Sequence, residues 1–408
     1  MNRNHLNIFL LFIGQGLTGT IVSLLTLTST LVGNRLSPMD SLSTLPVTAT
    51  VCGAALMVYY ASMLMEKYGR RNAFAIGNVI GIAGSGLAGI AIVHQSFAFF
   101  TLGTFILGGS TVFNQYYRFA AAEVFDNASS KKKAISLIIG GGITGGILGP
   151  YIAAKGAYLF PEYHFLGTFL LSAAVCIVTL ITQLFIRLPV VHKNKTTPLV
   201  SKESSQRDDF SGLLKSKLFF LATGSCAVGF SLMTLLMNAT PLAMLHKQFS
   251  IEESSFVLQW HFFAMYAPAL ALPFWVGRFK TANLIMSGAV FFLVGMVIAI
   301  FWDEKLGFLF SLIFIGLGWA FMFNGGTFLL NEFINSPFKH KLQGINSLVT
   351  YFSNMAASLS IGAIMGYQAG WGILNGAGIV VIGAFMVVFF IKSRGCKKYE
   401  QPQCRSVD

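Results

Sequence analysis

The sequence contains few charged residues for its length. Asp, Glu, Lys and Arg make up 11% of the 408 residues, whereas apolar residues make up 54%. In soluble domains about a quarter of the residues are charged, so this composition excludes an ordinary soluble protein. Uncharged apolar runs of eighteen or more residues recur along the chain. The sequence therefore predicts an integral membrane protein.

Cysteine is also scarce, and its spacing excludes two classes of site. The 5 cysteines are Cys52, Cys176, Cys226, Cys396 and Cys404, and no two of them have the spacing of a metal site. We therefore expect no disulfide, no metal and no cofactor.

Twelve apolar segments are long enough to cross a bilayer, and we expect each to be a helix. The long polar interruption at residues 188–215 follows the sixth segment. It divides the chain into an N-terminal six-helix bundle at 1–187, a cytoplasmic linker at 188–215, a C-terminal six-helix bundle at 216–391 and a cytoplasmic tail at 392–408. The predicted spans are approximately 6–31, 41–65, 73–93, 97–123, 134–158, 164–187, 216–240, 254–276, 282–301, 306–331, 342–367 and 371–391.

The distribution of basic residues predicts the orientation. The net charge of +13 does not indicate nucleic acid, because the basic residues lie in short loops between apolar segments. If the N-terminus is cytoplasmic, 24 of the 28 Lys and Arg face the cytoplasm, and the outer side keeps Arg35, Lys155, Lys247 and Lys305. The positive-inside rule then places both termini in the cytoplasm. No cleavable signal peptide is apparent, and we expect a monomer in a bacterial cytoplasmic (inner) membrane, in contact with lipid and with a small-molecule solute.

The two predicted bundles share a weak internal repeat. "FNQYYRFAAAEVF" (113–125) ends span four, and "FNGGTFLLNEF" (323–333) ends span ten. Phe113-Asn114 match Phe323-Asn324, and a basic loop follows each segment. Such repetition is typical of transporters with duplicated halves, whose solute site lies between the halves near the membrane midplane.

The loop after span two reveals a family resemblance. "SMLMEKYGRRNAF" (62–74) resembles the G-x-x-x-D-R-x-G-R-R loop of the major facilitator superfamily, with Gly69, Arg70 and Arg71 as matches and Glu66 in place of the Asp. The second half keeps a remnant, "FWVGRFKTANL" (274–284). The resemblance implies an all-α fold of two pseudo-symmetric six-helix bundles that works by alternating access.

Span five carries a second resemblance within this superfamily. "GGGITGGILGPYIAA" (140–154) is similar to the glycine-rich stretch of the superfamily's drug antiporters. Small residues let helices approach closely, and Pro150 disturbs the helical hydrogen bonds, so the segment is either a flexing interface or ordinary tight packing. The Arg that the antiporters carry in span four is absent, which weighs against drug export.

Charged residues at the inner helix ends are candidates for a gate. Arg118 lies 21 residues after Phe97, which is about 31 Å deeper and therefore at the cytoplasmic end. Superfamily members carry charges where the inner helix ends meet, and we expect Arg118 to pair with Glu123 or Glu66 when the inner mouth is closed. The alternative is that Arg118 only snorkels to the membrane surface. The gating candidates are Glu66, Arg70, Arg71, Arg118, Glu123, Arg278 and Glu332.

Polar and aromatic residues at suitable depth are the candidates for solute binding. Rings can stack on a planar solute, and amides can orient it. Many aromatic residues must nevertheless face lipid or pack between helices. The solute-binding candidates are Gln15, Asn114, Gln115, Tyr116, Trp260, His261, Tyr266, Trp319, Asn324, Tyr351 and Asn354.

No Asp or Glu lies in the middle of a predicted span, which bears on energy coupling. Proton-coupled transporters usually need a buried titratable group. His261 is the candidate proton site, although a histidine at such a position is more often a hydrogen-bonded structural residue. Otherwise transport runs downhill.

These features predict a secondary transporter and not an enzyme, because no catalytic set of residues is present. Without a deep charge, the candidates suit a small, polar, neutral or aromatic nutrient such as a vitamin or nucleoside. "QYYRFAAAE" also resembles a segment of bacterial permeases of the superfamily, including riboflavin-type ones. The alternative is a proton-coupled exporter of drugs, metabolites or siderophores, and a channel or membrane enzyme is a further rival.

Overall fold

The computed structural model describes residues 3–125, 128–188, 210–275, 280–333, 339–367 and 369–394. Within these ranges every regular element is a helix, as the apolar runs predict. The elements are α1 (Arg3–Leu36), η1 (Asp40–Leu42), α2 (Leu45–Val93), α3 (Phe97–Thr111), η2 (Val112–Tyr116), α4 (Tyr117–Ala122), α5 (Ala128–Ala157), α6 (Leu166–Leu184), α7 (Phe210–Leu214), α8 (Lys217–His246), α9 (Ile251–Trp275), α10 (Thr281–Phe301), α11 (Lys305–Phe333), α12 (Lys339–Met365) and α13 (Gly370–Arg394).

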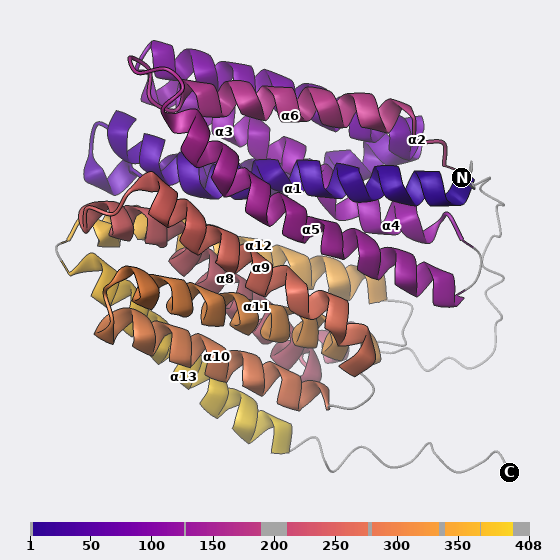
Figure 1. Ribbon diagram of the computed structural model, residues 1–408. Coiled ribbons are helices and arrows are strands. Elements are labelled where there is room, and N and C mark those ends of the chain that lie inside the picture. The colour runs from indigo at the N-terminus through magenta and orange to yellow at the C-terminus, as the bar shows by residue number, and fades with distance from the viewer. Residues whose placement is uncertain are drawn as a thin grey trace, which may run out of the picture.

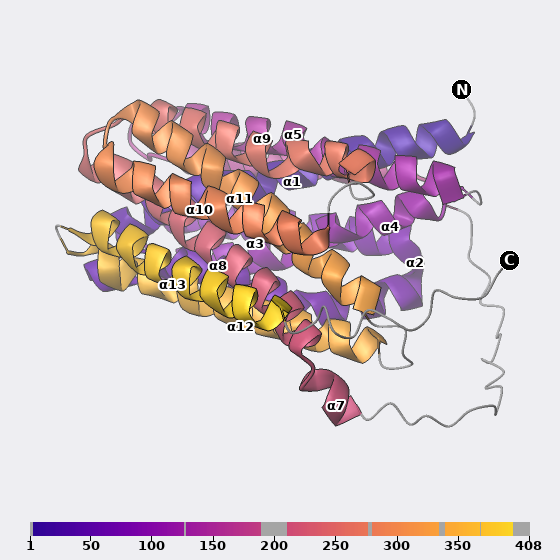
Figure 2. The ribbon, with the colours of Figure 1, turned by 90° about the horizontal axis from the view of Figure 1, so that it is seen from below.

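Helices α1 to α6 lie on one side of the molecule and α8 to α13 on the other (Figure 1). We call these the N-terminal and C-terminal sides. The near end of the bundle is where α1 begins at Arg3, and the far end is where α1 ends at Leu36. Figure 2 shows the short helix α7 at the near end. Most of the predicted linker (189–209) and tail (395–408) lies outside the described residues, so their boundaries stay predictions.

Ten helices in the described part of the chain are long and apolar enough to cross a membrane. One of them, Asp40–Val93, contains both the second and the third predicted span. Helix α9 coincides with the eighth predicted span but is not among the ten. The predicted all-helical membrane architecture is therefore confirmed, whereas the number of twelve spans stays a prediction.

The second and third predicted spans are two helical segments that share the label α2 and meet at a kink. Helix α2 runs from Leu45 to Val93 and contains one non-helical residue, Gly69, with φ 79° and ψ 162°. A side chain would clash with the backbone at such a φ, so glycine is required there for conformational reasons. Gly69 therefore interrupts the helix and turns the chain at the near end, between the second and third predicted spans.

The fourth predicted span is also not one regular helix. Between α3 and α4 lies a 3₁₀ segment, η2, from Val112 to Tyr116, and it contains Asn114 and Gln115. A 3₁₀ stretch inside a helix has poorer hydrogen-bond geometry and often marks a functional segment. The break has no sequence signal of the usual kind, because no proline lies near it.

Helix α5 joins the two sides through its glycines. A Cβ at Gly145 would lie 2.6 Å from the Gly16 carbonyl oxygen of α1, and one at Gly146 would lie 2.4 Å from Cβ of Phe262 in α9. The Ser23 hydroxyl of α1 also donates a hydrogen bond of 2.7 Å to the Gly145 carbonyl. Small residues thus let α5 approach α1 on one face and α9 on another.

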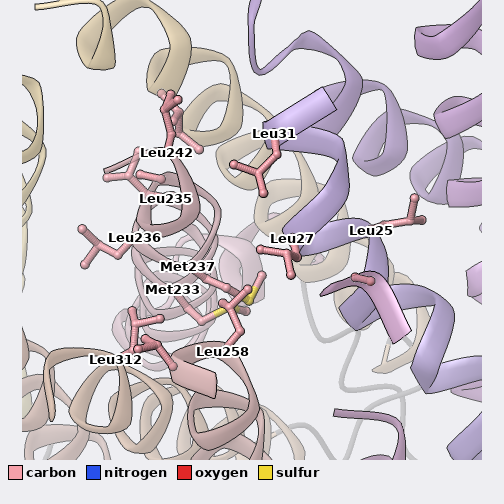
Figure 3. Close-up of a cluster of buried hydrophobic side chains, with 14 of the residues drawn as sticks. Leu25, Leu27, Leu31, Met233, Leu235, Leu236, Met237, Leu242, Leu258 and Leu312 are labelled. Atoms are coloured by element: carbon pink, nitrogen blue, oxygen red, sulfur yellow. The ribbon is translucent and has the colours of Figure 1, made fainter. Parts of the chain in front are cut away.

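An apolar core continues across the two sides. It contains Leu27 of α1, Met233 of α8 and Leu258 of α9, all buried. In Figure 3, Leu27 and Leu31 lie on the part of α1 that faces α8, whereas Leu25 points away from it. Between helices in a membrane such packing stabilises by dispersion, because lipid is as apolar as the side chains.

Helices α2 and α12 are held together in their far halves. Gly362 N–H donates to the Thr44 hydroxyl at 2.9 Å, and the Thr48 and Ser358 hydroxyls are 3.0 Å apart. Toward the near end the same helices expose Tyr59, Met63, Leu348 and Phe352. The two sides therefore join closely along α2 and α12 at the far end and leave these apolar side chains uncovered at the near end.

Candidate solute-binding site

Four half-buried aromatic side chains form a cluster on the C-terminal side. Trp319 and Phe323 of α11 stack, with ring centroids 5.3 Å apart and planes 9° apart. Phe230 of α8 lies edge-on to Trp319 at 6.1 Å, and Tyr266 of α9 does so at 6.5 Å. We call these four residues the aromatic cluster. Stacked and edge-to-face rings at such distances form a rigid apolar surface on which a planar ring can stack.

The aromatic cluster borders the boundary between the two sides. Tyr266 packs against α5, where a Cβ at Gly142 would lie 3.3 Å from its ring. The Trp319 indole N–H is buried and has no hydrogen-bond partner among the described residues. Because buried donors are normally paired, this N–H is a candidate donor to an acceptor atom of a ligand.

Three amides predicted to bind solute differ in their partners. The Oδ1 atoms of Asn114 and Asn354 are buried without a described hydrogen-bond partner, whereas Asn324 donates to the Ala320 carbonyl within its own helix at 2.6 Å. Asn114 and Asn324 match in the sequence repeat but are not equivalent, because Asn114 lies in η2 and Asn324 in a regular helix. An acceptor without a partner can bind a donor group of a ligand, so Asn114 and Asn354 remain the better candidates.

The remaining candidates near the boundary lie on both sides of it. Gln115 Nε2 donates to the Tyr351 hydroxyl of α12 at 3.2 Å, which joins η2 to the C-terminal side. Tyr116 instead donates to the Val58 carbonyl of α2 at 3.4 Å. Gln15 is half-buried on α1, where its side chain packs near Gly141 of α5.

Trp260 and His261 do not belong to the aromatic cluster. Trp260 is 43% exposed and packs with Phe256 and Phe263, which are exposed on the same face of α9. His261 is fully buried, and its Nδ1 lies 2.7 Å from the Leu312 carbonyl of α11. Nδ1–H must donate to this carbonyl, which leaves Nε2 as a buried acceptor without a described partner. The ring therefore fits a structural role between α9 and α11, and its role in coupling stays a prediction.

Of the predicted gate residues that the structure describes, Arg70 and Glu123 form an ion pair at the near end. Arg70 Nε donates to Glu123 Oε2 at 2.7 Å, and Nη2 donates to Oε1 at 2.5 Å. The pair is partly shielded, with side-chain exposures of 23% and 32%. Bidentate geometry of this kind fixes the two groups relative to each other. It connects α2, just after Gly69, to the end of α4.

The other predicted gate residues are not brought into this pair. Glu66 and Arg71 are exposed near Gly69, and Arg118 is exposed on α4 above the Phe119 ring, 4.9 Å from its centroid. Arg118 forms no ion pair within the described part of the chain, because Glu123 is bound to Arg70. The predicted contact of Arg118 concerns a closed inner mouth and stays a prediction. Arg278 lies outside the described residues, and only the backbone is described at Glu332.

Comparison with known proteins decides the family. The sequence profile of the Major Facilitator Superfamily matches residues 5–358. The chain belongs to the Major Facilitator Superfamily. Members of this superfamily are transporters, so the predicted class is confirmed and the rival membrane enzyme is excluded.

Relatives cover almost the whole length of this superfamily member. The riboflavin transporter RfnT of Brucella anthropi is 29% identical over 386 residues, 95% of each chain. The uncharacterized MFS-type transporter YddS of Bacillus subtilis is 24% identical and covers 91% of this chain and 86% of its own. The predicted resemblance to the superfamily, with a riboflavin-type relative, is thereby confirmed.

Solved structures of the superfamily share the fold at low sequence identity. A bacterial homologue of the human lysosomal transporter Spinster, in an inward-facing and unoccupied conformation, has a TM-score of 0.76 at 13% identity, with coverage of 99% of this chain and 100% of that one. The nucleoside transporter NupG has a TM-score of 0.70 at 17% identity, with coverage of 95% and 99%.

Sequence reasoning missed two groups of residues in this transporter. Phe230 and Phe323 complete the aromatic cluster, and Phe323 could have been found because it follows Trp319 by one helical turn. Tyr117 is buried, and its hydroxyl accepts from Gln183 Nε2 and lies 3.3 Å from the Thr18 hydroxyl. Asn78 donates to Gln183 Oε1 at 2.6 Å, so this network joins α1, α2, α4 and α6. Such buried networks rigidify the helices that they connect.

Proposed function

We propose that this superfamily transporter imports a planar, polar organic nutrient with an aromatic ring system, of which riboflavin is the first example to test. The observation that carries the proposal is the aromatic cluster with the unpaired Trp319 indole N–H. A planar ring stacks on Trp319 or Phe230, and an oxygen or nitrogen acceptor at its edge takes the indole hydrogen. Sidedness follows the positive-inside prediction, with the near end in the cytoplasm.

The opposite side of the boundary supports the same class of solute. Asn114 and Asn354 offer buried acceptors, and Gln115 and Tyr351 offer further polar groups. A ring system held by stacking and a polar substituent held by amides is the division of roles that small-molecule sites show. RfnT, similar over 95% of the chain, transports riboflavin, and NupG transports nucleosides, which also carry a planar ring.

Alternating access is the proposed mechanism. In this mechanism, the state that is open toward the far end requires the contacts between Thr44 and Gly362 and between Thr48 and Ser358 at that end to break. We propose that the Arg70–Glu123 pair holds α2 and α4 together as a unit during this movement. The charged gate residues named from the sequence then act at the near end.

Equilibrium binding of riboflavin to the purified protein, followed by quenching of flavin fluorescence, tests the proposal. Stacking of a base on an aromatic side chain contributes about 1–3 kcal/mol, so we expect Trp319→Leu to raise Kd about 5- to 150-fold. Trp319→Phe keeps a ring but removes the N–H, and it should weaken binding by about fivefold to tenfold. Trp302→Phe is the matched control, because Trp302 lies at the far end of α10 with its indole near Glu304.

Two outcomes would contradict the proposed site. If Trp319→Leu and Trp302→Phe bind riboflavin as the wild type does, the aromatic cluster is not the binding surface. If the wild type binds neither riboflavin nor any nucleoside or related ring, the proposed substrate class is wrong. Trp260→Phe, on the exposed face of α9, should behave like the control.

A further inference from the structure

Arg118 lies at the boundary between the two sides, and within the described part of the chain it has no counter-charge. It lies three residues before the end of the apolar stretch Phe97–Ala121. Among the described residues its contacts are the Phe119 ring and the electrostatic influence of Tyr351, and no acidic side chain pairs with it. A guanidinium near a membrane interior normally has an anionic partner, and it stays exposed here.

Gln115 and Tyr351 place further hydrogen-bond donors beside Arg118. Gln115 precedes Arg118 by three residues, so both side chains lie on the same face of the η2–α4 segment. Gln115 Nε2 donates one hydrogen to the Tyr351 hydroxyl. Because that hydroxyl oxygen accepts, its own hydrogen is directed elsewhere, and no described acceptor takes it. The second Nε2 hydrogen of Gln115 is also without a described acceptor.

The three side chains therefore present donors and no negative charge. Arg118 contributes five N–H groups, and the Tyr351 O–H and a Gln115 N–H lie next to it. We propose that Arg118, Gln115 and Tyr351 form a subsite for an anionic oxygen group of the solute, a carboxylate or a phosphate. The subsite draws its donors from both sides of the boundary, and a bound anion contacts both sides at once.

The inference rests on the proposed function in one respect, because the subsite serves the same solute path as the aromatic cluster. Helical depth supports this, since Trp319 and Tyr351 each lie about 14 residues from the far end of their helices and Gln115 lies about 18. The pathway then accepts ring systems that carry an acidic substituent in addition to neutral ones. Charge-assisted hydrogen bonds are about twice as strong as neutral ones, so the subsite selects among solutes by charge.

The experiment compares solutes that differ only in an anionic group. Purified protein is titrated with riboflavin and with riboflavin 5′-phosphate, and thermal stabilisation is measured with benzoate and with its neutral isostere benzamide. The variants are Arg118→Gln, Arg118→Lys and the control Lys392→Gln. Lys392 is a suitable match, because it also lies over a phenylalanine ring, 3.6 Å from the centroid of Phe220, but on the peripheral helix α13.

We expect Arg118→Gln to raise the Kd of riboflavin 5′-phosphate by about tenfold or more. The Kd of riboflavin should change by less than about twofold. In the same variant, the thermal stabilisation by benzoate should fall to the thermal stabilisation by benzamide. Arg118→Lys should keep most of the preference for anions, and Lys392→Gln should behave as the wild type.

The proposal is overturned if the wild type does not distinguish anionic from neutral probes in either pair, or if Arg118→Gln keeps the distinction. It is also overturned if Arg118→Gln weakens all probes equally, because that result indicates the gating role, which shifts the conformation without regard to solute charge. Absence of flavin binding with a retained, Arg118-dependent benzoate effect would refute the proposed flavin substrate and support the anion subsite.

Discussion

Replacing Gly145 by Ala probes the contact on which the arrangement of the N-terminal side depends. The added Cβ would lie 2.6 Å from the Gly16 carbonyl oxygen, 2.7 Å from the Gly19 carbonyl carbon and 2.8 Å from the Gly19 Cα. All three atoms belong to the backbone of α1, so no side chain can rotate away to make room. Helix α1 must move instead, and this also weakens the hydrogen bond from Ser23 to the Gly145 carbonyl.

Overpacking of this kind costs about 1–3 kcal/mol. We therefore expect the melting temperature in detergent to fall by about 1–4 °C. A thiol-reactive dye can report the melting, because Cys176 in α6 and Cys226 in α8 are buried in the folded protein. The control is Gly383→Ala in α13, where no atom lies within 4 Å of the added Cβ. Equal melting temperatures for the two variants would refute the assignment of Gly145 to a close helix contact.

Two further predictions concern ion pairs at opposite ends of the molecule. Glu123→Gln removes the charge that binds Arg70 at the near end, and because both groups are partly exposed we expect a loss of about 1 kcal/mol, measured by thermal melting, with slower transport. A fully active variant with unchanged melting would contradict a role of this pair. At the far end, the backbone N–H of Ser250 and the nearby Lys305 lower the pKa of Glu253 below its ordinary value. Since the folded-state pKa is the lower one, the stabilisation is present above about pH 4.3 and is lost as pH falls through the folded-state pKa. Glu253→Gln should remove this part of the acid sensitivity, and an unchanged melting curve against pH would contradict the assignment.

The sequence predicted the membrane class, the helical fold and the family, because apolar length and a specific loop motif are both local features. The depth of Trp319, Tyr351 and Asn114 in the membrane follows from residue counts along a span and stays a prediction. What the sequence did not predict is which way each helix faces. Most of the described helices are apolar on all sides, so periodicity does not indicate their rotation. Trp260 and His261 illustrate the difficulty, because neighbouring residues on a helix point about 100° apart and only one of them is buried.

The missed local features have the same origin. The 3₁₀ segment η2 carries no proline, and the Tyr117 network depends on Thr18, Asn78 and Gln183 from three other helices. Such contacts arise from packing between distant segments, which a single sequence does not reveal. Gly69 is the opposite case, because its positive φ lies within the family-like loop that the sequence showed.

Solute counterflow in proteoliposomes tests the central claim most directly. Vesicles that contain the purified protein are loaded with unlabelled riboflavin and diluted into a trace of labelled riboflavin. A carrier that alternates between two states and binds riboflavin accumulates the label transiently, at a rate that saturates with concentration. We expect this result for the wild type and for Trp302→Phe, and a rate at least about fivefold lower for Trp319→Leu. Flux that rises linearly without saturation, or counterflow that is unchanged in Trp319→Leu, would contradict the account.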